Sequence, residues 1–250
     1  MKIYRIIRKI LHILFKLNLY KTLYINYKML PFRQAIFIPI FVYGKINFRG
    51  MRGSIIINEK IYTGMIVIGY KYSYTKTSVP LSVWTINGKI IFNGRIRFLN
   101  GTYVLVTDNA ELLFGTNGTI IGSDTKIMCF EKIHIGNTVR ITWECQIMDT
   151  GFHYVKDINN DNTGRLTKPI VIGNNVWIAN RTTIMKGSII PDWTIVASNS
   201  LVNKDFSNIG NFCMLAGQPA KVKSTNIQRI FDAEEQRELD NIYHYERTHL

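Results

Sequence analysis

The stretch IGNNVWIANRTTIMKGSIIPDWTIVASNSLV, residues 172–202, repeats one feature every six positions. The feature is an aliphatic residue, which recurs without a miss at Ile172, Ile178, Ile184, Ile190, Val196 and Val202. A period of six fits neither the 3.6-residue period of a helix nor the two-residue period of a strand. Short self-similarity of this kind is typical of a solenoid. The stretch therefore predicts a parallel β-helix, in which each hexad is a strand with a corner and about 18 residues complete a coil.

The same spacing recurs upstream, in two further runs: Ile121, Ile127 and Ile133, then Ile135, Ile141 and Ile147. Small residues often follow the aliphatic one: Gly122, Gly136, Gly173, Ala179 and Ala197. We expect the aliphatic residue to point into the axis and stack on its counterparts, while the small residue fits a tight corner.

The predicted fold class is an all-β solenoid, and the β-helix domain spans residues 46–223. Residues 121–223 form its regular coils. Residues 46–120 keep the hexad at Ile90 and Ile96 but lose it elsewhere, which predicts irregular first coils. From about Asn226 the spacing becomes helical, so we expect a C-terminal helix within residues 224–250 that caps the open end of the solenoid.

The N-terminal segment, residues 1–45, is strongly basic. The chain carries a net charge of +14, and no acidic residue precedes Glu59. Aliphatic residues from Ile3 to Leu17 follow one helical face and basic residues from Arg5 to Lys16 follow another, which predicts a basic amphipathic helix. Such a helix could lie on an anionic membrane surface, or pack its apolar face on the domain behind it.

Composition argues against several other classes. Basic residues interrupt the N-terminal apolar stretch and no small-residue cleavage site follows, so we expect no secretory signal. No window approaches the roughly 18 uninterrupted apolar residues of a spanning helix. No nucleic-acid motif accompanies the basic charge, so we expect no nucleic-acid partner. Three cysteines cannot all pair within one chain and none forms a CxxC motif, which predicts reduced thiols in a cytoplasmic protein.

The repeat stops at His153. Six positions after Ile147 the pattern calls for an aliphatic residue, but the chain has this histidine, and the hexad then disappears for more than a dozen residues. Residues 154–168 therefore form a predicted loop that protrudes from the coil. The histidine is either a loop residue in contact with water or part of an active site.

Two segments resemble a known family. NNVWIANRTTIMKGSIIPDWTIVASNSLVNKD (174–205) and LAGQPAKV (215–222) resemble the hexapeptide-repeat acyltransferases. These include the maltose and galactoside O-acetyltransferases and the O-acetyltransferases of bacterial capsule and lipopolysaccharide assembly. The resemblance spans roughly residues 121–223. It implies a left-handed β-helix, a homotrimer with active sites between neighbouring subunits, acetyl-CoA as the donor and no metal.

The resemblance makes His153 the catalytic histidine. A sugar hydroxyl is a poor nucleophile, so it needs a base that is neutral near pH 7 and can take its proton during attack on the thioester. No acyl-enzyme is required, because CoA is already an activated acyl carrier. Asp149 or Glu144 could orient the imidazole and stabilise its protonated form, or either could be an exposed corner carboxylate.

The resemblance also assigns binding residues by position. The CoA residues are Trp177, Ala179, Asn180, Ala197, Ser198, Asn203, Lys204 and Lys221. The two lysines would meet the 3′-phosphate end of CoA, and Trp177 could instead simply pack on a flat β face. Asp124 and Trp143 would contact the acceptor. Gly151 stands where many polysaccharide members carry an acid.

The predicted function is O-acetylation of a sugar or surface-polysaccharide precursor, and two alternatives remain open. N-acetylation of an amino sugar or small amine could use the same base. A non-catalytic β-helix for structure or surface binding would have no affinity for CoA. A serine acetyltransferase is disfavoured, because its large helical N-terminal domain is missing. A γ-class carbonic anhydrase needs three zinc-binding histidines, whereas only His134 and His153 lie in the coils.

Overall fold

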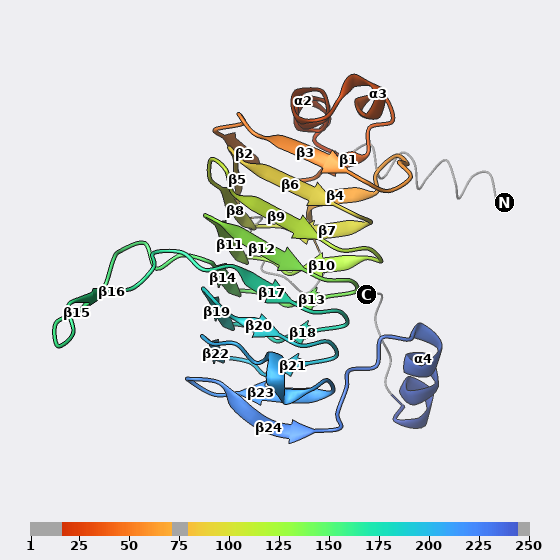
Figure 1. Cartoon of the computed structure of the whole chain (residues 1–250). Helices are drawn as coiled ribbons and strands as arrows, with labels where there is room; N and C mark the ends of the chain where they lie inside the picture. Colours follow the sequence, from red (N-terminus) through yellow and green to blue (C-terminus); the bar gives the residue numbers. More distant parts are fainter. Residues whose placement is uncertain (1–16, 72–79, 245–250) are drawn as a thin grey trace.

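The structure is a computed structural model that describes residues 17–71 and 80–244. The predicted N-terminal amphipathic helix lies outside these residues except for Leu17. In the described part the chain winds into a column of stacked coils with three flat sides, each side a sheet (Figure 1). We number the sheets 1, 2 and 3 in the order in which the chain first enters them. Successive strands pass from sheet 1 to sheet 2 to sheet 3 and back to sheet 1, and the coils wind in a left-handed sense. The left-handed parallel β-helix predicted from the sequence is confirmed.

The strands of each sheet lie in chain order. Sheet 1 contains β1 (Ile40–Val42), β4 (Ile66–Tyr70), β7 (Ile96–Leu99), β10 (Thr119–Ile121), β13 (Arg140–Ile141), β18 (Trp177–Ile178), β21 (Ile195–Val196), β23 (Cys213–Ala216) and β24 (Lys221–Thr225). Sheet 2 contains β2 (Ile46–Arg49), β5 (Ser82–Ile86), β8 (Tyr103–Val106), β11 (Lys126–Cys129), β14 (Gln146–Met148), β19 (Thr183–Met185) and β22 (Leu201–Val202). Sheet 3 contains β3 (Ser54–Ile57), β6 (Lys89–Phe92), β9 (Glu111–Phe114), β12 (Lys132–Ile135), β17 (Ile170–Ile172) and β20 (Ile189–Ile190).

The other elements lie outside these three sheets. They are the helices α2 (Leu19–Met29), α3 (Phe32–Ala35) and α4 (Ala233–Ile242), the 3₁₀ turn η1 (Ser207–Ile209), and the antiparallel pair β15 (Lys156–Asp157) and β16 (Asn162–Thr163). The pair β15–β16 forms the arm that projects from the coils in Figure 1.

The hexad residues fill the axis of the column. In sheet 1 the aliphatic residues stack in register from one strand to the next, in the order Ile121, Ile141, Ile178, Val196 and Leu215. All are buried. Each such side chain contributes about 1.5–3 kcal/mol by leaving water. The stack therefore supplies much of the stability of the coils from residue 121 onward, which we call the lower coils; those of residues 46–120 are the upper coils.

The first coils are more regular than the sequence predicted. Residues 46–120 contribute strands to all three sheets, and these pair in register except for a shift between Ile68 and Tyr70, where β4 pairs with β7. Two differences hide the repeat. Lys89 pairs with Glu111, 22 positions later, whereas Val171 pairs with Ile189, 18 positions later, so the upper coils are longer. The axis there also holds buried aromatic rings in place of isoleucines: Trp84, Phe92, Phe98 and Phe114.

The C-terminal helix is present, but it does not cap the column. Strand β24 pairs antiparallel with β23 and forms the last rung, so the predicted boundary at residue 224 falls inside a strand. Helix α4 begins at Ala233 and has no buried residue. Figure 1 places it beside the lower coils. The expectation of a helical cap was therefore wrong, because hydrogen bonds from β24 cover the last strand edge instead.

Candidate active site

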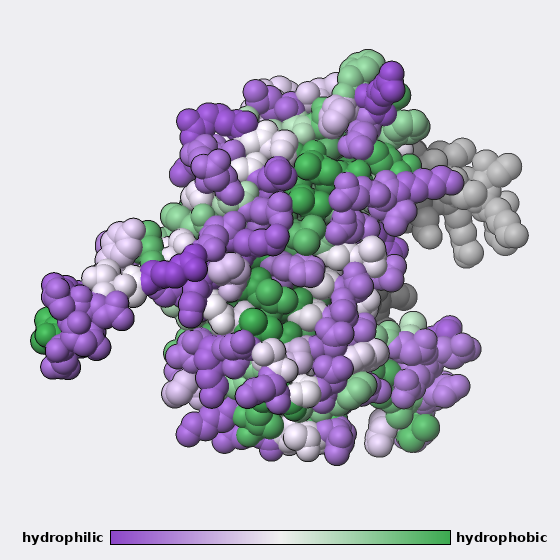
Figure 2. All heavy atoms as spheres, viewed as in Figure 1, coloured by the Kyte–Doolittle hydropathy of each residue, from purple (hydrophilic) through white to green (hydrophobic). Residues whose placement is uncertain are grey.

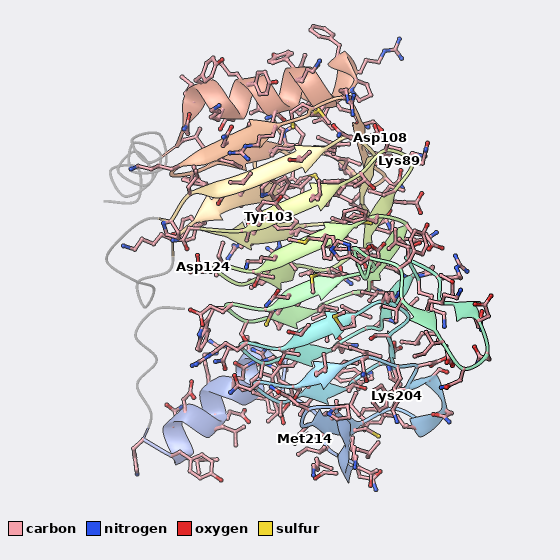
Figure 3. All side chains as sticks on the ribbon, turned by 90° about the vertical axis from the view of Figure 1, so that its left-hand side faces the viewer. Lys89, Tyr103, Asp108, Asp124, Lys204 and Met214 are labelled. Atoms are coloured by element: carbon pink, nitrogen blue, oxygen red, sulfur yellow. The ribbon has the colours of Figure 1, made fainter. Side chains whose placement is uncertain are left out.

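Most of the predicted site residues lie on two corners of the column, and Trp177 lies on the face of sheet 1. Corner 1–2 joins sheet 1 to sheet 2, and corner 2–3 joins sheet 2 to sheet 3. The face of sheet 2 separates them, and Figure 3 shows this face with Asp124 at one border and Lys204 toward the other. The single chain therefore does not bring all the predicted residues together.

Corner 1–2 is a ladder of backbone hydrogen bonds between successive coils. Glu144 N–H donates to the carbonyl of Ser123 at 2.9 Å, and Arg181 N–H donates to that of Trp143 at 3.1 Å. Asn199 N–H donates to that of Asn180 at 3.0 Å. The ladder stacks the exposed Trp143 directly above Asn180 in the next coil.

The side chains of corner 1–2 include most of the predicted CoA residues. Ser198 Oγ donates to Asn180 Oδ1 at 2.7 Å. Ala179 and Ala197 hold equivalent positions in successive coils. Their N–H groups donate to the carbonyls of Val196 and Leu215, each in the following coil. Because the coil already uses these two amides, a ligand at this corner would have to bind other groups. Two further predicted residues, Asp124 and Lys221, lie at the same corner, beside Asn100 and opposite Ala216 respectively.

Corner 2–3 carries the loop of residues 151–168. Its two ends are joined by a bridge between Thr150 and Thr167, and by a hydrogen bond from Gly151 N–H to the carbonyl of Leu166 at 2.9 Å. Glu131, in the coil above, accepts hydrogen bonds from Arg165 at 3.2 Å and from Thr167 at 2.6 Å. The base of the loop is therefore anchored at several points, while its tip projects into solvent.

His153 lies at the root of this loop and its side chain is exposed. The preceding Phe152 has a φ of +59°, a backbone conformation that costs a bulky residue about 1–3 kcal/mol. Its ring packs edge-on against Phe130 at 5.5 Å, and His153 N–H donates to the Gly151 carbonyl at 2.7 Å. These contacts hold a strained turn that presents the imidazole outward.

Asp149 has a structural task. Its buried carboxylate accepts hydrogen bonds from the N–H groups of Phe130 at 2.7 Å and of Glu131 and Lys132 at 2.8 Å. Burial raises the pKa of this carboxyl, and the three hydrogen bonds partly oppose that rise. The carboxylate thus points into the coil above, and the structure gives it no hydrogen bond to His153 among the described residues.

Glu144 stands at the far end of β14 from His153. Asp149 follows it five positions later along the chain, which is about 16 Å of extended chain. Its carboxylate lies 3.7 Å from Nε of Arg181 on corner 1–2. Within one chain Glu144 is therefore too far away to orient His153.

The remaining predicted CoA residues are dispersed. Asn203 and Lys204 are exposed on corner 2–3, and Nζ of Lys204 lies 5.0 Å from the ring centre of Phe206. Trp177 lies on the face of sheet 1, with the guanidinium of Arg229 at 5.3 Å from its ring centre. The segment leading into α4 thus packs on Trp177, which favours the packing role for this side chain.

Sequence reasoning missed Lys186. Its ammonium donates to the carbonyls of Arg165 and Leu166 and so closes the base of the loop. A Cβ built on Gly151 would stand 3.2 Å from Nζ of Lys186. The lysine therefore lies beside Gly151. This is the position at which, by the resemblance described above, many polysaccharide members of the family carry an acidic residue. The hexad pattern contains no signal for it, because Lys186 follows an ordinary strand.

Among the described residues, no group of three or more His, Cys, Asp or Glu side chains is arranged to hold a metal ion. His134 is half-buried on the outer face of sheet 3, between Leu113 and Val171 in the neighbouring strands. Burial lowers the pKa of its imidazole, and the nearby charge of Lys132 lowers it further.

The fold and the repeat define the chain as a hexapeptide-repeat left-handed β-helix. No protein-family profile matches it. An uncharacterized 24.8 kDa protein in the cps region of Klebsiella pneumoniae is 34% identical over 140 residues, or 56% of this chain and 60% of that protein. A probable acetyltransferase of Mycobacterium tuberculosis is 28% identical over 114 residues, or 45% of this chain and 36% of that protein.

The chain thus spans less than two thirds of the length of each of these curated relatives. A solved structure, the polySia-specific acetyltransferase NeuO, aligns with 82% of this chain and 97% of its own at 20% identity and a TM-score of 0.49. The resemblance to acetyltransferases that the sequence motifs carried is thus found again among the curated relatives.

Proposed function

We propose that the protein is an acetyl-CoA-dependent O-acetyltransferase that acts on a sugar or a surface-polysaccharide precursor. The observation that carries this proposal is the interruption of the coils at His153, an exposed histidine at the root of an anchored loop. The acetyltransferase motifs, the probable acetyltransferase relative and the relative in a cps region support the reaction and the acceptor class.

In this mechanism His153 acts as the general base. Its imidazole accepts the proton of the acceptor hydroxyl while the oxygen attacks the thioester carbonyl of acetyl-CoA. The carbon–sulfur bond then breaks, and the CoA sulfur leaves and takes the proton back from the imidazolium. The products are an acetyl ester and free CoA, and no covalent acyl-enzyme forms.

We propose that the active enzyme is a homotrimer. In one chain the face of sheet 2 separates His153 on corner 2–3 from the predicted CoA residues of corner 1–2. A neighbouring subunit that sets its corner 1–2 against this corner 2–3 would complete the site.

The outer face of sheet 3 supports an assembly of this kind. Its strands align a column of half-exposed side chains, apolar except for the histidine: Ile56, Ile91, Leu113, His134, Val171 and Ile189. Figure 2 shows this hydrophobic band running down the front of the column between hydrophilic borders. Light scattering should give about three times the 28.9 kDa chain mass, and an active monomer would contradict the trimer.

We place the protein in the cytoplasm, in peripheral contact with the inner face of the membrane through the basic N-terminal segment, for which the sequence predicts an amphipathic helix. The three cysteines, which are unpaired and buried, fit a reducing compartment. No helix of the described residues is long and apolar enough to cross a bilayer.

The test is release of free thiol from acetyl-CoA in the presence of sugars, amino sugars and polysaccharide repeat units. His153→Asn should lower acetyl transfer by about 10²–10⁴-fold, because the amide cannot accept the proton. Binding of acetyl-CoA, measured by calorimetry, should change little. The matched control is His244→Asn, which alters an exposed histidine outside the coils.

The same assay separates the alternatives. A preference for amino sugars, with an amide product that resists alkaline hydroxylamine, would identify an N-acetyltransferase. No thiol release with any acceptor and no CoA binding would identify a non-catalytic β-helix. Full turnover by His153→Asn would overturn the assignment of the base.

A further inference from the structure

Helix α2 has one buried face and, opposite to it, an exposed aromatic face. One face consists of Thr22, Ile25, Asn26 and Met29, and it is buried against the first coil. The opposite face carries Tyr20, Tyr24 and Tyr27, which follow the i, i+4, i+7 spacing of a single stripe and are exposed. A surface helix normally turns its polar side to water, so the aromatic stripe requires an explanation.

The buried face holds α2 rigidly. Asn26 Nδ2 donates to the carbonyl of Ile40 at 2.7 Å, and Asn26 Oδ1 accepts from Ile40 N–H at 3.1 Å. Thr22 Oγ1 accepts from Val42 N–H at 3.0 Å. These buried hydrogen bonds fix the helix on β1, so the direction of its outer face is set by the fold.

The exposed rings form two pairs on the same side of α2 and α3, which we together call the tyrosine face: Tyr20 with Tyr24, and Tyr27 with Phe32. The rings of Tyr20 and Tyr24 stack at 6.4 Å, and those of Tyr27 and Phe32 lie 6.3 Å apart. Tyr20 is 71% exposed and Phe32 is 73% exposed. A cluster of exposed aromatic side chains on a protein surface marks a site of interaction.

Basic residues accompany the tyrosine face on α2 and α3. Lys21 places its ammonium 5.5 Å from the ring centre of Tyr20, and Lys28 and Arg33 lie on the same two helices. The described residues 17–58 contain six basic residues and no acidic one. Aromatic rings with a polar tip, interleaved with lysine and arginine, match the boundary between headgroups and acyl chains of an anionic bilayer.

We propose that the tyrosine face docks the protein on the surface of an anionic lipid bilayer. This surface is distinct from the predicted helix of residues 3–17 and does not depend on the acetyl-transfer reaction. Helices α2 and α3 lie at the N-terminal end of the column (Figure 1), so docking would stand the coils upright on the membrane. His153, four coils further along, would then lie about 20 Å beyond the first coil.

The test measures cosedimentation of the full-length protein with vesicles of phosphatidylcholine mixed with phosphatidylserine. Tyr20→Ser combined with Tyr27→Ser should weaken binding by about tenfold or more, because the serines remove interfacial aromatic area. The matched control combines Tyr62→Ser with Tyr243→Ser, which removes two exposed tyrosines elsewhere and should bind as the wild type does. Both altered residues of α2 are exposed, so the fold should persist, and circular dichroism checks this.

A charge variant tests the lipid class. Lys21→Gln combined with Lys28→Gln should reduce both the preference for phosphatidylserine and the weakening of binding by salt, because other basic residues of the N-terminal segment remain. Three results would overturn the proposal. One is wild-type protein that ignores these vesicles at low salt. Another is a tyrosine variant that binds as tightly as wild type, which would leave residues 1–16 as the anchor. The third is a tyrosine variant of lower mass in light scattering, which would make the face a contact between copies.

Discussion

The carbonyl of Leu166 accepts a hydrogen bond from the ammonium of Lys186 at 3.2 Å, and the same carbonyl accepts one from Gly151 N–H at 2.9 Å. One oxygen thus joins both ends of the loop to the next coil. Because Gly151 lies two residues before His153, this junction controls the position of the candidate base. Lys186 is therefore a positioning residue for the proposed reaction.

Lys186→Met keeps the aliphatic stem but removes both hydrogen bonds to the loop. We expect acetyl transfer to fall about tenfold through kcat, with KM for acetyl-CoA nearly unchanged, because the base is displaced. Hydrogen exchange at Gly151 N–H should accelerate as the loop root opens. Lys156→Met, in the projecting hairpin, is the control and should change neither quantity. Unchanged exchange at Gly151 would show that Lys186 does not hold the loop.

Asp149→Ala leaves the N–H groups of Phe130, Glu131 and Lys132 without their acceptor. Each buried donor that loses its partner costs about 1–3 kcal/mol, so we expect the free energy of unfolding to fall by at least about 3 kcal/mol. Asp149→Asn should also lower the free energy of unfolding, because the side-chain NH₂ group would face a backbone N–H group and could not accept its hydrogen bond. Urea unfolding measures both. A variant with wild-type stability but slow acetyl transfer would instead support an orienting role for this carboxylate.

The lower coils could be predicted from sequence because their physical constraints are local. The buried residues Ile172 and Ile190 pair one short coil apart, so the axis position recurs at a fixed spacing that one strand and one corner determine. The upper coils have corners of other lengths, and Phe98 or Phe114 fills the axis there. A search for aliphatic residues at one fixed period cannot find such coils.

The site could be predicted only in part. The loss of the hexad draws attention to His153, and the resemblance to the acyltransferases makes it the candidate base. The contacts of Asp149 reach amides 17 to 19 residues earlier, and Lys186 reaches the loop from the next coil. Such contacts depend on how coils stack rather than on spacing along the chain. Strand β24 was missed for a similar reason, since all five of its residues are exposed and show no apolar alternation.

Cys145 should make the protein sensitive to alkali. Burial raises the pKa of this thiol to about 11, whereas an unfolded cysteine titrates with a pKa of about 8.5. A raised pKa stabilises the folded state fully below the unfolded value, and that contribution is lost as pH rises toward the folded value. We expect stability to fall above about pH 8.5. Cys145→Ala should flatten this fall in urea unfolding measured at successive pH values, and an identical slope would contradict the assignment.

Gly122 fills a corner where no side chain fits. A Cβ at this position would stand 2.3 Å from the backbone carbonyl of Thr142 in the next coil. Gly122 N–H also donates to Ile141 at 2.8 Å, so neither coil can move away without losing that bond. Gly122→Ala should therefore destabilise the protein by about 1–3 kcal/mol, as overpacking in a close-packed interior does.

The matched control for this corner is Gly164→Ala. A Cβ on Gly164 would meet only the Val155 carbonyl, at an ordinary contact distance of 3.8 Å. This change should stay within about 0.5 kcal/mol of wild type. The comparison of the two urea midpoints isolates the steric demand of the corner from the general effect of replacing glycine. If the two variants unfold at the same midpoint, the coils at Gly122 can separate, and close stacking at corner 1–2 does not limit stability.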